Sequence, residues 1–317
     1  MPQQVSGDLR YQLEADWGRL PPGLRLGQTG VATDSRDRVY LFNRGPRPVI
    51  VLDAAGRFVT AWDDPRLNDA HGIFIDSRDH LYLPVKNAHV VLKYRADGEL
   101  LSIIGRRDDP ADTGYDGNFR HLPARPSGPF NRPTDAAVAP SGDIYISDGY
   151  GNSRVHRFTA DGALVQSWGE PGKDSPGRFH VPHGVWVDPD GRVLVADREN
   201  NRIQVFTGDG RFLVQWRDLR RPSDIFVDSD GLVYVAELDS LVAVLAPDGE
   251  LLARWGSPTG AGEMKGGHQI WLDSRGDLYV GQNQEGHRIL KYRRCRVGAS
   301  REDLAPRQSA VQEPSRF

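Results

Sequence analysis

Short apolar runs alternate with polar turns along most of the chain, and six of these runs share one pattern. In each, a run of small and large apolar residues ends at an anchor position, and a polar turn leads into a second apolar run. The six copies read TGVATDSRDRVYL, HGIFIDSRDHLYL, TDAAVAPSGDIYI, HGVWVDPDGRVLV, SDIFVDSDGLVYV and HQIWLDSRGDLYV. β-rich runs bounded by Asp, Ser, Pro and Gly predict antiparallel strands joined by tight turns.

The spacing of the copies predicts how the strands assemble. Successive anchors lie 40 to 63 residues apart, at Asp34, Asp76, Ala139, Asp188, Asp228 and Asp273. A strand-forming repeat of about this length is typical of propeller blades, in which each blade buries its faces against its neighbours. We therefore predict an all-β fold, a six-bladed β-propeller, as a single domain over residues 1–295.

Each unit is predicted to contain four strands in an antiparallel meander. In the fourth unit the second, third and fourth strands are expected at Val193–Ala196, Arg202–Phe206 and Phe212–Trp216. Most fourth strands end at a tryptophan, which we expect to pack on the outer strand: Trp62, Trp168, Trp216 and Trp255. The second unit has Ile103 and Ile104 at this place.

The last unit lacks a fourth strand of its own. Its first three strands are expected at Gln269–Leu272, Leu278–Val280 and Arg288–Tyr292, and no similar fourth phrase follows. The missing phrase occurs near the N-terminus, from Tyr11 to Gly18. We predict that this N-terminal strand completes the last blade and leaves no long free edge. The polar residues 296–317 are expected to form a loosely ordered C-terminal tail.

Composition narrows the partners and the compartment. The chain has 40 basic and 43 acidic side chains and a net charge of -3, so no phosphate-binding field is implied and nucleic acid is not expected as a partner. Cys295 is the single cysteine, and the N-terminus has neither a basic nor an apolar leader region. No segment is long and apolar enough to span a membrane. These features predict a cytoplasmic protein.

One position in the repeat distinguishes the copies that carry a candidate site residue from the copies that do not. Five residues before the anchors, the six copies have Thr29, His71, Thr134, His183, Ser223 and His268. First strands line the axis of a propeller, so histidines on alternate blades converge on one point. Three imidazoles with an open fourth position suit a catalytic metal, and zinc is favoured by availability over other divalent transition metals. The alternative is a slot of small polar or aromatic groups that bond channel water.

The loops that follow the second strands lie on the same face as the histidines. They carry Arg44, Tyr150 and Arg198, and the long insertion Gly105–Asn131 reaches the same face. A tyrosine beside a divalent cation and guanidinium groups is a candidate general base, and guanidinium groups suit a carboxylate. Arg198 can instead pair with Glu199 or Asp197. The pattern predicts a small-molecule substrate that carries a carboxylate.

Several strings resemble one family in particular. SDGYGNSRV, VPHGVWVD, ADRENNRIQVF and the His71-Gly72 phrase are similar to the NHL-repeat propeller of peptidyl-α-hydroxyglycine α-amidating lyase, and the similarity extends over nearly all six blades. The resemblance implies zinc bound by His71, His183 and His268, Tyr150 as base and Arg44 as the group that holds the substrate carboxylate. It also implies cleavage of the C–N bond of a carbinolamide to an amide and glyoxylate.

The chain departs from this family at several positions. Gly151 stands where the family has a cysteine, and Gln269 stands where the family has an aspartate that binds structural calcium, so calcium is not expected. We predict a zinc-dependent lyase acting on an N-acyl hemiaminal, an α-hydroxyglycine-like compound. The alternatives are a metal-dependent hydrolase or hydro-lyase for a small carboxylate, and a non-catalytic NHL binding scaffold.

Overall fold

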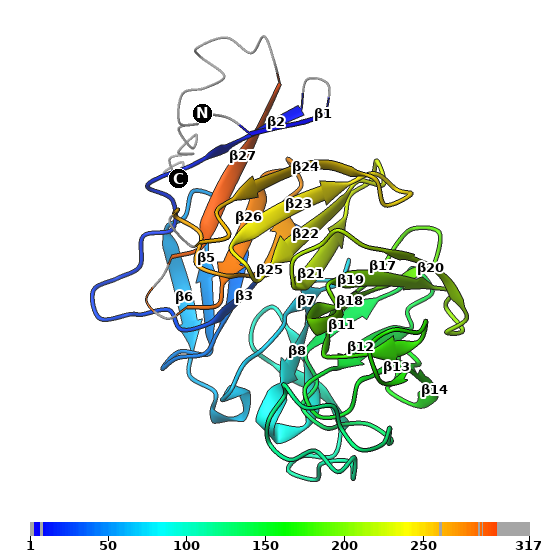
Figure 1. The fold of residues 1–317 in the computed structure, drawn as a ribbon. Coiled ribbons are helices and arrows are strands. Elements are labelled where there is room, and N and C mark those ends of the chain that lie inside the picture. The colour runs from blue at the N-terminus through cyan, green and yellow to red at the C-terminus, as the bar shows by residue number, and fades with distance from the viewer. Residues whose placement is uncertain (1–2, 7–8, 260–261, 285, 287, 297–317) are drawn as a thin grey trace.

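Six antiparallel sheets arranged around a central axis form the computed structural model, in which strands predominate and the helical segments among the described residues are three short 3-10 turns (Figure 1). The structure describes residues 3–6, 9–259, 262–284, 286 and 288–296. In every sheet the first strand lies innermost, where β3, β7, β11, β17, β21 and β25 meet. The prediction of a six-bladed β-propeller is confirmed.

The strands of the first three blades follow the predicted meander. Blade 1 contains β3 (Thr29–Thr33), β4 (Val39–Asn43), β5 (Val49–Leu52) and β6 (Phe58–Trp62). Blade 2 contains β7 (Phe74–Ile75), β8 (His80–Val85), β9 (Val90–Arg95) and β10 (Leu100–Gly105). Blade 3 contains β11 (Asp135–Val138), β12 (Ile144–Asp148), β13 (Arg154–Phe158) and β14 (Leu164–Trp168).

The other blades follow the same plan. Blade 4 contains β17 (Pro182–Val187), β18 (Val193–Asp197), β19 (Arg202–Phe206) and β20 (Phe212–Trp216). Blade 5 contains β21 (Pro222–Val227), β22 (Val233–Glu237), β23 (Leu241–Leu245) and β24 (Leu251–Gly256). Blade 6 contains β25 (Gly267–Leu272), β26 (Leu278–Gln282), β27 (Leu290–Arg296), β2 (Leu9–Leu13) and β1 (Gln3–Ser6). The remaining elements are β15 (Glu170–Pro171), β16 (Arg178–Phe179), η1 (Pro65–Leu67), η2 (Lys86–Ala88) and η3 (Arg198–Asn200).

The anchor aspartates have a local structural role. Asp34 Oδ1 accepts the backbone N–H groups of Arg36 and Arg38, and so closes the turn between the first two strands. A tyrosine hydroxyl six residues on, here that of Tyr40, donates to the same carboxylate. The anchor carboxylates of blades 2, 5 and 6 make the same set of bonds. Ala139 cannot make these bonds, so the blade 3 turn relies on its backbone hydrogen bonds.

The fourth-strand tryptophans pack between blades rather than only on their own sheet. A β-carbon placed at Gly210, in the turn between β19 and β20, would lie 2.8 Å from Trp168 Cδ2 of the preceding blade. Trp216 meets the equivalent turn of blade 5 in the same way, and Ile104 replaces the tryptophan between blades 2 and 3. The tryptophans therefore bury the seams of the ring, a more specific role than the one predicted.

The N-terminus closes the ring as predicted, with different bounds. β2 pairs antiparallel with β27, but it runs over Leu9–Leu13 rather than Tyr11–Gly18. Trp17 follows β2 and packs on the Gly56 turn of blade 1. β27 begins later than the predicted Arg288, and β1 adds an outer fifth strand that the sequence pattern did not predict. The predicted tail, 296–317, lies outside the described residues apart from its first residue.

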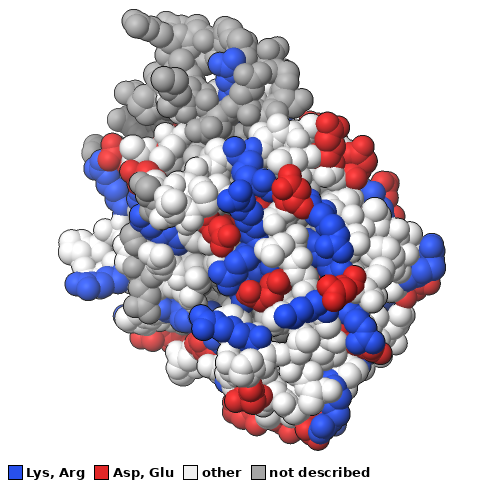
Figure 2. Space-filling model, in the orientation of Figure 1, with Lys and Arg blue, Asp and Glu red and all other residues white. Residues whose placement is uncertain are grey.

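Charge is distributed in mixed fashion over the surface. In Figure 2 basic side chains gather near the middle of the face shown, with acidic side chains interspersed among them. This face carries no field of a single sign. Within the described part of the chain, no helix is long and apolar enough to cross a bilayer.

Candidate metal centre

The three histidines of the repeat meet on the axis of the propeller. Their nearest ring nitrogens all lie within 4.8 Å of one another, and ring centroids are 4.7 to 5.2 Å apart. Each side chain is almost completely buried; His183 and His268 lie near the start of β17 and β25, and His71 lies three residues before β7. The structure therefore brings together His71, His183 and His268 from alternate blades. Small side-chain rotations would let the three nitrogens share one ion, so the residues present fit a metal.

The residues between the histidines explain how the rings are oriented. His71 Nδ1 lies 2.7 Å from the carbonyl oxygen of Thr134, and His183 Nδ1 lies 2.7 Å from that of Ser223. His268 Nδ1 makes the same contact with Thr29, at 3.3 Å. A carbonyl oxygen only accepts, so each Nδ1 carries the proton and each Nε2 presents its lone pair to the axis. The backbone carbonyls of the three intervening residues, Thr134, Ser223 and Thr29, thus orient the rings.

Burial keeps these imidazoles neutral. It lowers the pKa of His71 and of His183 well below the usual value, and it lowers the pKa of His268 to about 3. The neighbouring histidines and the guanidinium groups of Arg44 and Arg198 add to the effect. Neutral imidazole is the form that binds a metal ion, so the site is prepared to bind one at neutral pH.

Tyr150 reaches this centre from the loop after β12. Its hydroxyl lies 3.2 Å from His71 Nε2 and 3.3 Å from His183 Nε2, and it accepts a hydrogen bond of 3.2 Å from Arg198 Nη1. The guanidinium of Arg198 also lies 5.3 Å from the centroid of the tyrosine ring. The predicted base therefore lies directly beside the predicted ligands and beside Arg198.

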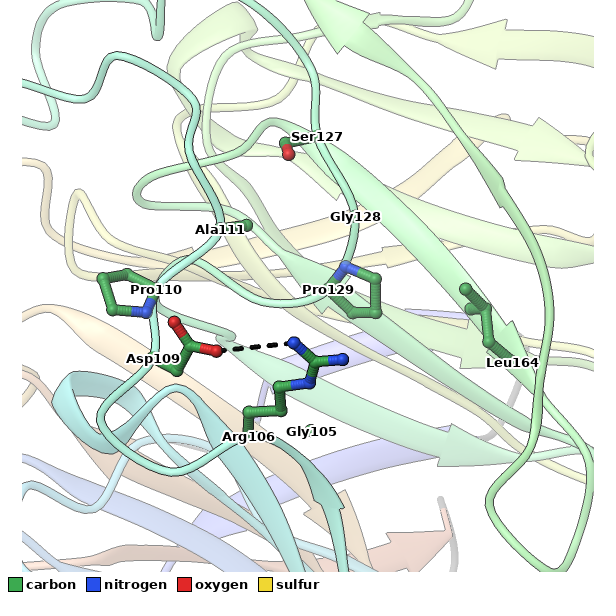
Figure 3. Close-up of a pocket in the computed structure, with 9 residues that line it drawn as sticks. All are labelled: Gly105, Arg106, Asp109, Pro110, Ala111, Ser127, Gly128, Pro129 and Leu164. Carbon is green, nitrogen blue, oxygen red and sulfur yellow. Dashed lines mark ion pairs between the residues drawn. The ribbon is translucent and has the colours of Figure 1, made fainter.

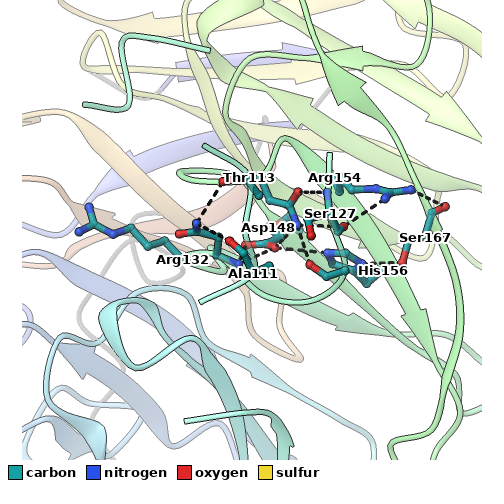
Figure 4. A network of polar contacts seen from close by, with 12 residues as sticks. Ala111, Thr113, Ser127, Arg132, Asp148, Arg154, His156 and Ser167 are labelled. Atoms are coloured by element: carbon teal, nitrogen blue, oxygen red, sulfur yellow. Dashed lines mark hydrogen bonds and ion pairs between the residues drawn. The ribbon is translucent and has the colours of Figure 1, made fainter. Parts of the chain in front are cut away.

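A buried polar network holds the Tyr150 loop (Figure 4). The Asp148 carboxylate accepts the backbone N–H of Asn131 at 2.8 Å and the amide of Asn152 at 2.8 Å. His156 Nε2 lies 3.3 Å from the same carboxylate, and Arg154 donates to the carbonyl of Ser127. These bonds tie the loop to the end of the insertion. The SDGYGNSR string thus contains a catalytic candidate and the residues that position it.

The two predicted arginines both face the centre. Arg44 Nε donates to the carbonyl of Ala70 at 3.1 Å and lies 3.5 Å from Asp69, and its Nη1 bonds Gln28. Its Nη2 is buried without a hydrogen-bond partner. Arg198 is almost fully buried, and its Nε is 2.9 Å from Glu199. Arg198 therefore combines the predicted ion pair with a contact to Tyr150.

The insertion contributes residues that the sequence did not single out. The Phe119 ring meets the Tyr150 ring edge-on, with centroids 5.6 Å apart, and lies 5.4 Å from the Arg198 guanidinium. His180 Nε2 lies 3.3 Å from the Phe119 carbonyl, whereas His121 pairs with Asp116 on the exposed part of the insertion. The insertion therefore forms one wall of the site through Phe119, and neither histidine reaches the metal centre.

A second polar layer lies next to the histidines in the channel. Gln269 Oε1 accepts the N–H groups of Val31 and Ile73, and its Nε2 donates to the Ile73 carbonyl. Burial raises the pKa of the Asp135 carboxyl and of the Asp224 carboxyl, which lie close together in this layer. A cavity of about 10 Å³ remains there, which is room for about one water molecule. Gln269 Oε1, which stands where the resembled family has a calcium-binding aspartate, already accepts two hydrogen bonds.

A larger cavity lies elsewhere, under the first part of the insertion (Figure 3). Its volume is about 600 Å³, and its lining includes Arg106, Asp109, Pro129 and Leu164. Arg106 and Asp109 form an exposed ion pair at 3.6 Å. The lining lacks the histidines and Tyr150, so we assign the chemistry to the end of the channel where the histidine Nε2 atoms meet the Tyr150 hydroxyl.

Comparison with known proteins identifies NHL repeats in the chain. The NHL repeat model matches residues 130–158 and 179–206. The chain is 33% identical over 248 residues to rat peptidylglycine alpha-amidating monooxygenase, covering 67% of this chain but only 24% of that protein. It is 27% identical to peptidyl-alpha-hydroxyglycine alpha-amidating lyase 2 of Drosophila melanogaster, covering 80% of this chain and 63% of the relative.

Solved structures agree on the fold. A gluconolactonase from Xanthomonas campestris superposes with a TM-score of 0.65 at 18% identity, over 93% of this chain and 95% of that one. A streptogramin B lyase superposes with a TM-score of 0.61 at 16% identity, over 90% of this chain and 98% of that one.

Human NHL repeat-containing protein 3 is 32% identical over 256 residues, which cover 75% of this chain and 70% of the relative. With this extent of similarity, the chain belongs to the NHL-repeat propeller family.

Proposed function

We propose that the protein is a metal-dependent lyase that cleaves the C–N bond of an N-acyl hemiaminal. The observation that carries the proposal is the position of the Tyr150 hydroxyl, between the Nε2 atoms of His71 and His183 and the guanidinium of Arg198. The similarity to amidating lyases supports the same chemistry. Because the sequence identity to these lyases is low, the similarity does not specify the acyl group of the substrate.

The residues of the site divide the work. His71, His183 and His268 would hold a zinc ion, whose Lewis acidity would polarise a substrate oxygen. Arg44 offers its buried, unpartnered Nη2 to the substrate carboxylate. Arg198 stabilises negative charge on the Tyr150 oxygen, and the Phe119 ring limits water access on the insertion side.

The reaction balances with groups that the site supplies. The Tyr150 phenolate removes the proton of the substrate hydroxyl, the electron pair left on that oxygen forms the carbonyl, and the C–N bond breaks with its electrons moving to nitrogen. The departing amide nitrogen takes up a proton from the newly formed tyrosine hydroxyl. An N-acyl-α-hydroxyglycine thus yields a primary amide and glyoxylate, with no net change in oxidation state.

Metal analysis and product analysis test the proposal together. Protein purified without chelators and then soaked with zinc is expected to retain about one equivalent, because three protein ligands form one site. The variant His183→Ala should lose most of this metal, whereas His121→Ala, on the exposed part of the insertion, should retain it. Glyoxylate release from N-acyl-α-hydroxyglycines should require the bound metal.

The alternatives give different outcomes. A metal-dependent hydrolase on the same three histidines would hydrolyse members of an ester and lactone panel and release no glyoxylate. A binding scaffold would bind a macromolecule equally well in the double variant His71→Ala/His183→Ala. Absence of metal from both the purified and the zinc-soaked protein would contradict the lyase and the hydrolase alike.

A further inference from the structure

The position immediately after each second strand carries a cation in three of the six blades. In blade order the residues at this position are Arg44, Lys86, Gly149, Arg198, Leu238 and Asn283. Arg44 and Arg198 already have assigned roles in the proposed mechanism. Lys86 has none, although the propeller places it on the same face and on the blade between Arg44 and Tyr150.

Lys86 points into the site rather than into solvent. Its Nζ lies 5.5 Å from the centroid of the Tyr150 ring, on which Arg198 also packs. The Lys86 side chain is only 16% exposed. Both Lys86 Nζ and Arg44 Nε lie 3.5 Å from the single Oδ1 of Asp69, so two cations share one carboxylate oxygen.

Among the described residues, Asp69 is the only carboxylate within ion-pair distance of Arg44 and Lys86, and the Tyr150 oxygen is bonded by Arg198. Glu199 pairs with Arg198 at 2.9 Å and with Arg221 at 3.0 Å, and Arg221 also lies 3.9 Å from Asp239. Arg132 bonds the Tyr115 hydroxyl at 3.3 Å, and no carboxylate among the described residues lies within ion-pair distance of its guanidinium. Burial and the charge of Arg44 lower the pKa of Lys86, and Arg132 adds to this repulsion. An anion bound beside Lys86 would reduce the repulsion between Lys86 and these arginines.

We propose that the substrate is a dianion, with one carboxylate bound by Arg44 and a second carboxylate, at the far end of the acyl group, bound by Lys86. This inference rests on the proposed function and deepens it, because it names the substrate class. A substrate with a single carboxylate would neutralise either Arg44 or Lys86. The other cation would remain partly buried with only a shared carboxylate beside it. A second carboxylate matches the compact charge of a lysine ammonium.

Two substrates that differ at one group test the inference. N-succinyl-α-hydroxyglycine has a terminal carboxylate, and N-succinamoyl-α-hydroxyglycine has a carboxamide of the same shape. The zinc-loaded wild type is expected to show a kcat/KM about tenfold higher for the succinyl compound, as one charge-assisted hydrogen bond at a partly exposed site allows. Lys86→Gln should remove this preference by slowing the succinyl compound alone.

Lys93→Gln is the matched control. Lys93 also lies over a tyrosine ring, 5.0 Å from the centroid of Tyr82, but it lines a cavity beside the anchor turns on the opposite face. This variant should keep the wild-type preference. An equal loss for both substrates in Lys86→Gln would overturn the inference, since it would mean that Lys86 acts only through Tyr150. Equal rates for the two substrates in the wild type would also overturn it.

Calorimetry separates this inference from the proposed lyase activity. The amide products, succinamate and succinamide, are titrated into the zinc-loaded wild type and Lys86→Gln proteins in the presence of glyoxylate. Tighter binding of succinamate that depends on Lys86 supports the dianion site, even if neither hydroxyglycine is cleaved. In that case the lyase proposal fails and the dianion site stands. Equal binding of the two amides in the wild type would overturn the site.

Discussion

At the scale of single residues, Tyr150 is the group on which the proposed chemistry depends. Tyr150→Phe should lower kcat by roughly 10²- to 10⁴-fold, the usual contribution of a general base. Zinc content should stay at the wild-type level, because the three histidines are retained. The control is Tyr145→Phe on β12, whose hydroxyl bonds the Gly208 carbonyl in the β19–β20 turn of the next blade. Loss of zinc in Tyr150→Phe would contradict a purely chemical role.

The buried carboxyl pair in the channel predicts a dependence of stability on pH. Burial raises the pKa of Asp224 to about 7, and the pKa of Asp135 is raised for the same reason. The folded protein therefore holds protons that the unfolded chain releases above about pH 4. The stabilisation that these protons give is present below pH 4 and is lost as the pH rises toward 7.

The variant Asp224→Asn tests this prediction, because an amide at this position cannot ionise. In metal-stripped protein, it should lose less unfolding free energy than the wild type between pH 4 and 7, by on the order of 1–3 kcal/mol. Urea titrations at several pH values measure the difference. Asp190→Asn, in an exposed turn, should follow the wild-type curve. Parallel curves for Asp224→Asn and the wild type would contradict the prediction.

The repeat alignment predicted some residues of the site and missed others for identifiable reasons. The histidines are identifiable because they alternate with Thr and Ser at one repeat position, and the backbone carbonyls of those Thr and Ser residues contact the Nδ1 atoms. Lys86 occupies the same repeat position as Arg44, and this equivalence is the signal in the sequence that could have identified it. Phe119 could not be predicted, because the insertion has no counterpart in the repeat.

At the scale of strands and turns, the seams between blades limit what the turns can accept. Gly249 has a φ of +94°, and a methyl group there would overlap the Trp216 ring of the preceding blade. Gly191 has a similar φ of +78° but has open space where a β-carbon would lie. Both positions favour glycine for backbone reasons, and only Gly249 adds a packing constraint.

Gly249→Ala should therefore destabilise the protein more than Gly191→Ala. Backbone strain should cost each variant about 1 kcal/mol, and overpacking at the seam should add roughly 1–3 kcal/mol to Gly249→Ala. Thermal unfolding with a tryptophan fluorescence readout measures both, since Trp216 lies at the altered seam. Equal losses of stability in the two variants would show that the Trp216 ring moves aside without destabilising the protein.

Strand order was predictable, whereas some strand ends were not. The alternating pattern located β19 and β20 at the predicted bounds. The N-terminal phrase was placed too late, because Trp17 reads as the end of a fourth strand. In the structure Trp17 fills the seam with blade 1 from a position after β2. Trp17 therefore packs as a fourth-strand tryptophan does, although it lies outside the strand. The sequence pattern of a single strand does not indicate such a shift.

At the scale of the whole molecule, the two ends of the chain meet in one sheet. Tyr11 on β2 is fully buried, stacks on Trp255 of blade 5 at 6.0 Å and donates to the Gly276 carbonyl of blade 6. Tyr11→Ala should reduce the unfolding free energy by roughly 3–5 kcal/mol, as for other large buried aromatic residues. Tyr11→Phe should lose only about 1 kcal/mol, since it keeps the ring. Denaturant titration measures both, and a loss under 1 kcal/mol in Tyr11→Ala would mean that the N-terminal strand contributes little to closure.

The contact between His268 and Thr29 has a consequence for when the protein can act. His268 comes from the last blade, and its Nδ1 proton is held by the backbone of the first. During synthesis the earlier blades emerge with two of the three imidazoles and with Thr29, but without His268, which contacts the Thr29 carbonyl. The centre is therefore absent from the growing polypeptide on the ribosome and forms only when blade 6 docks, so a truncated translation product has no competent site.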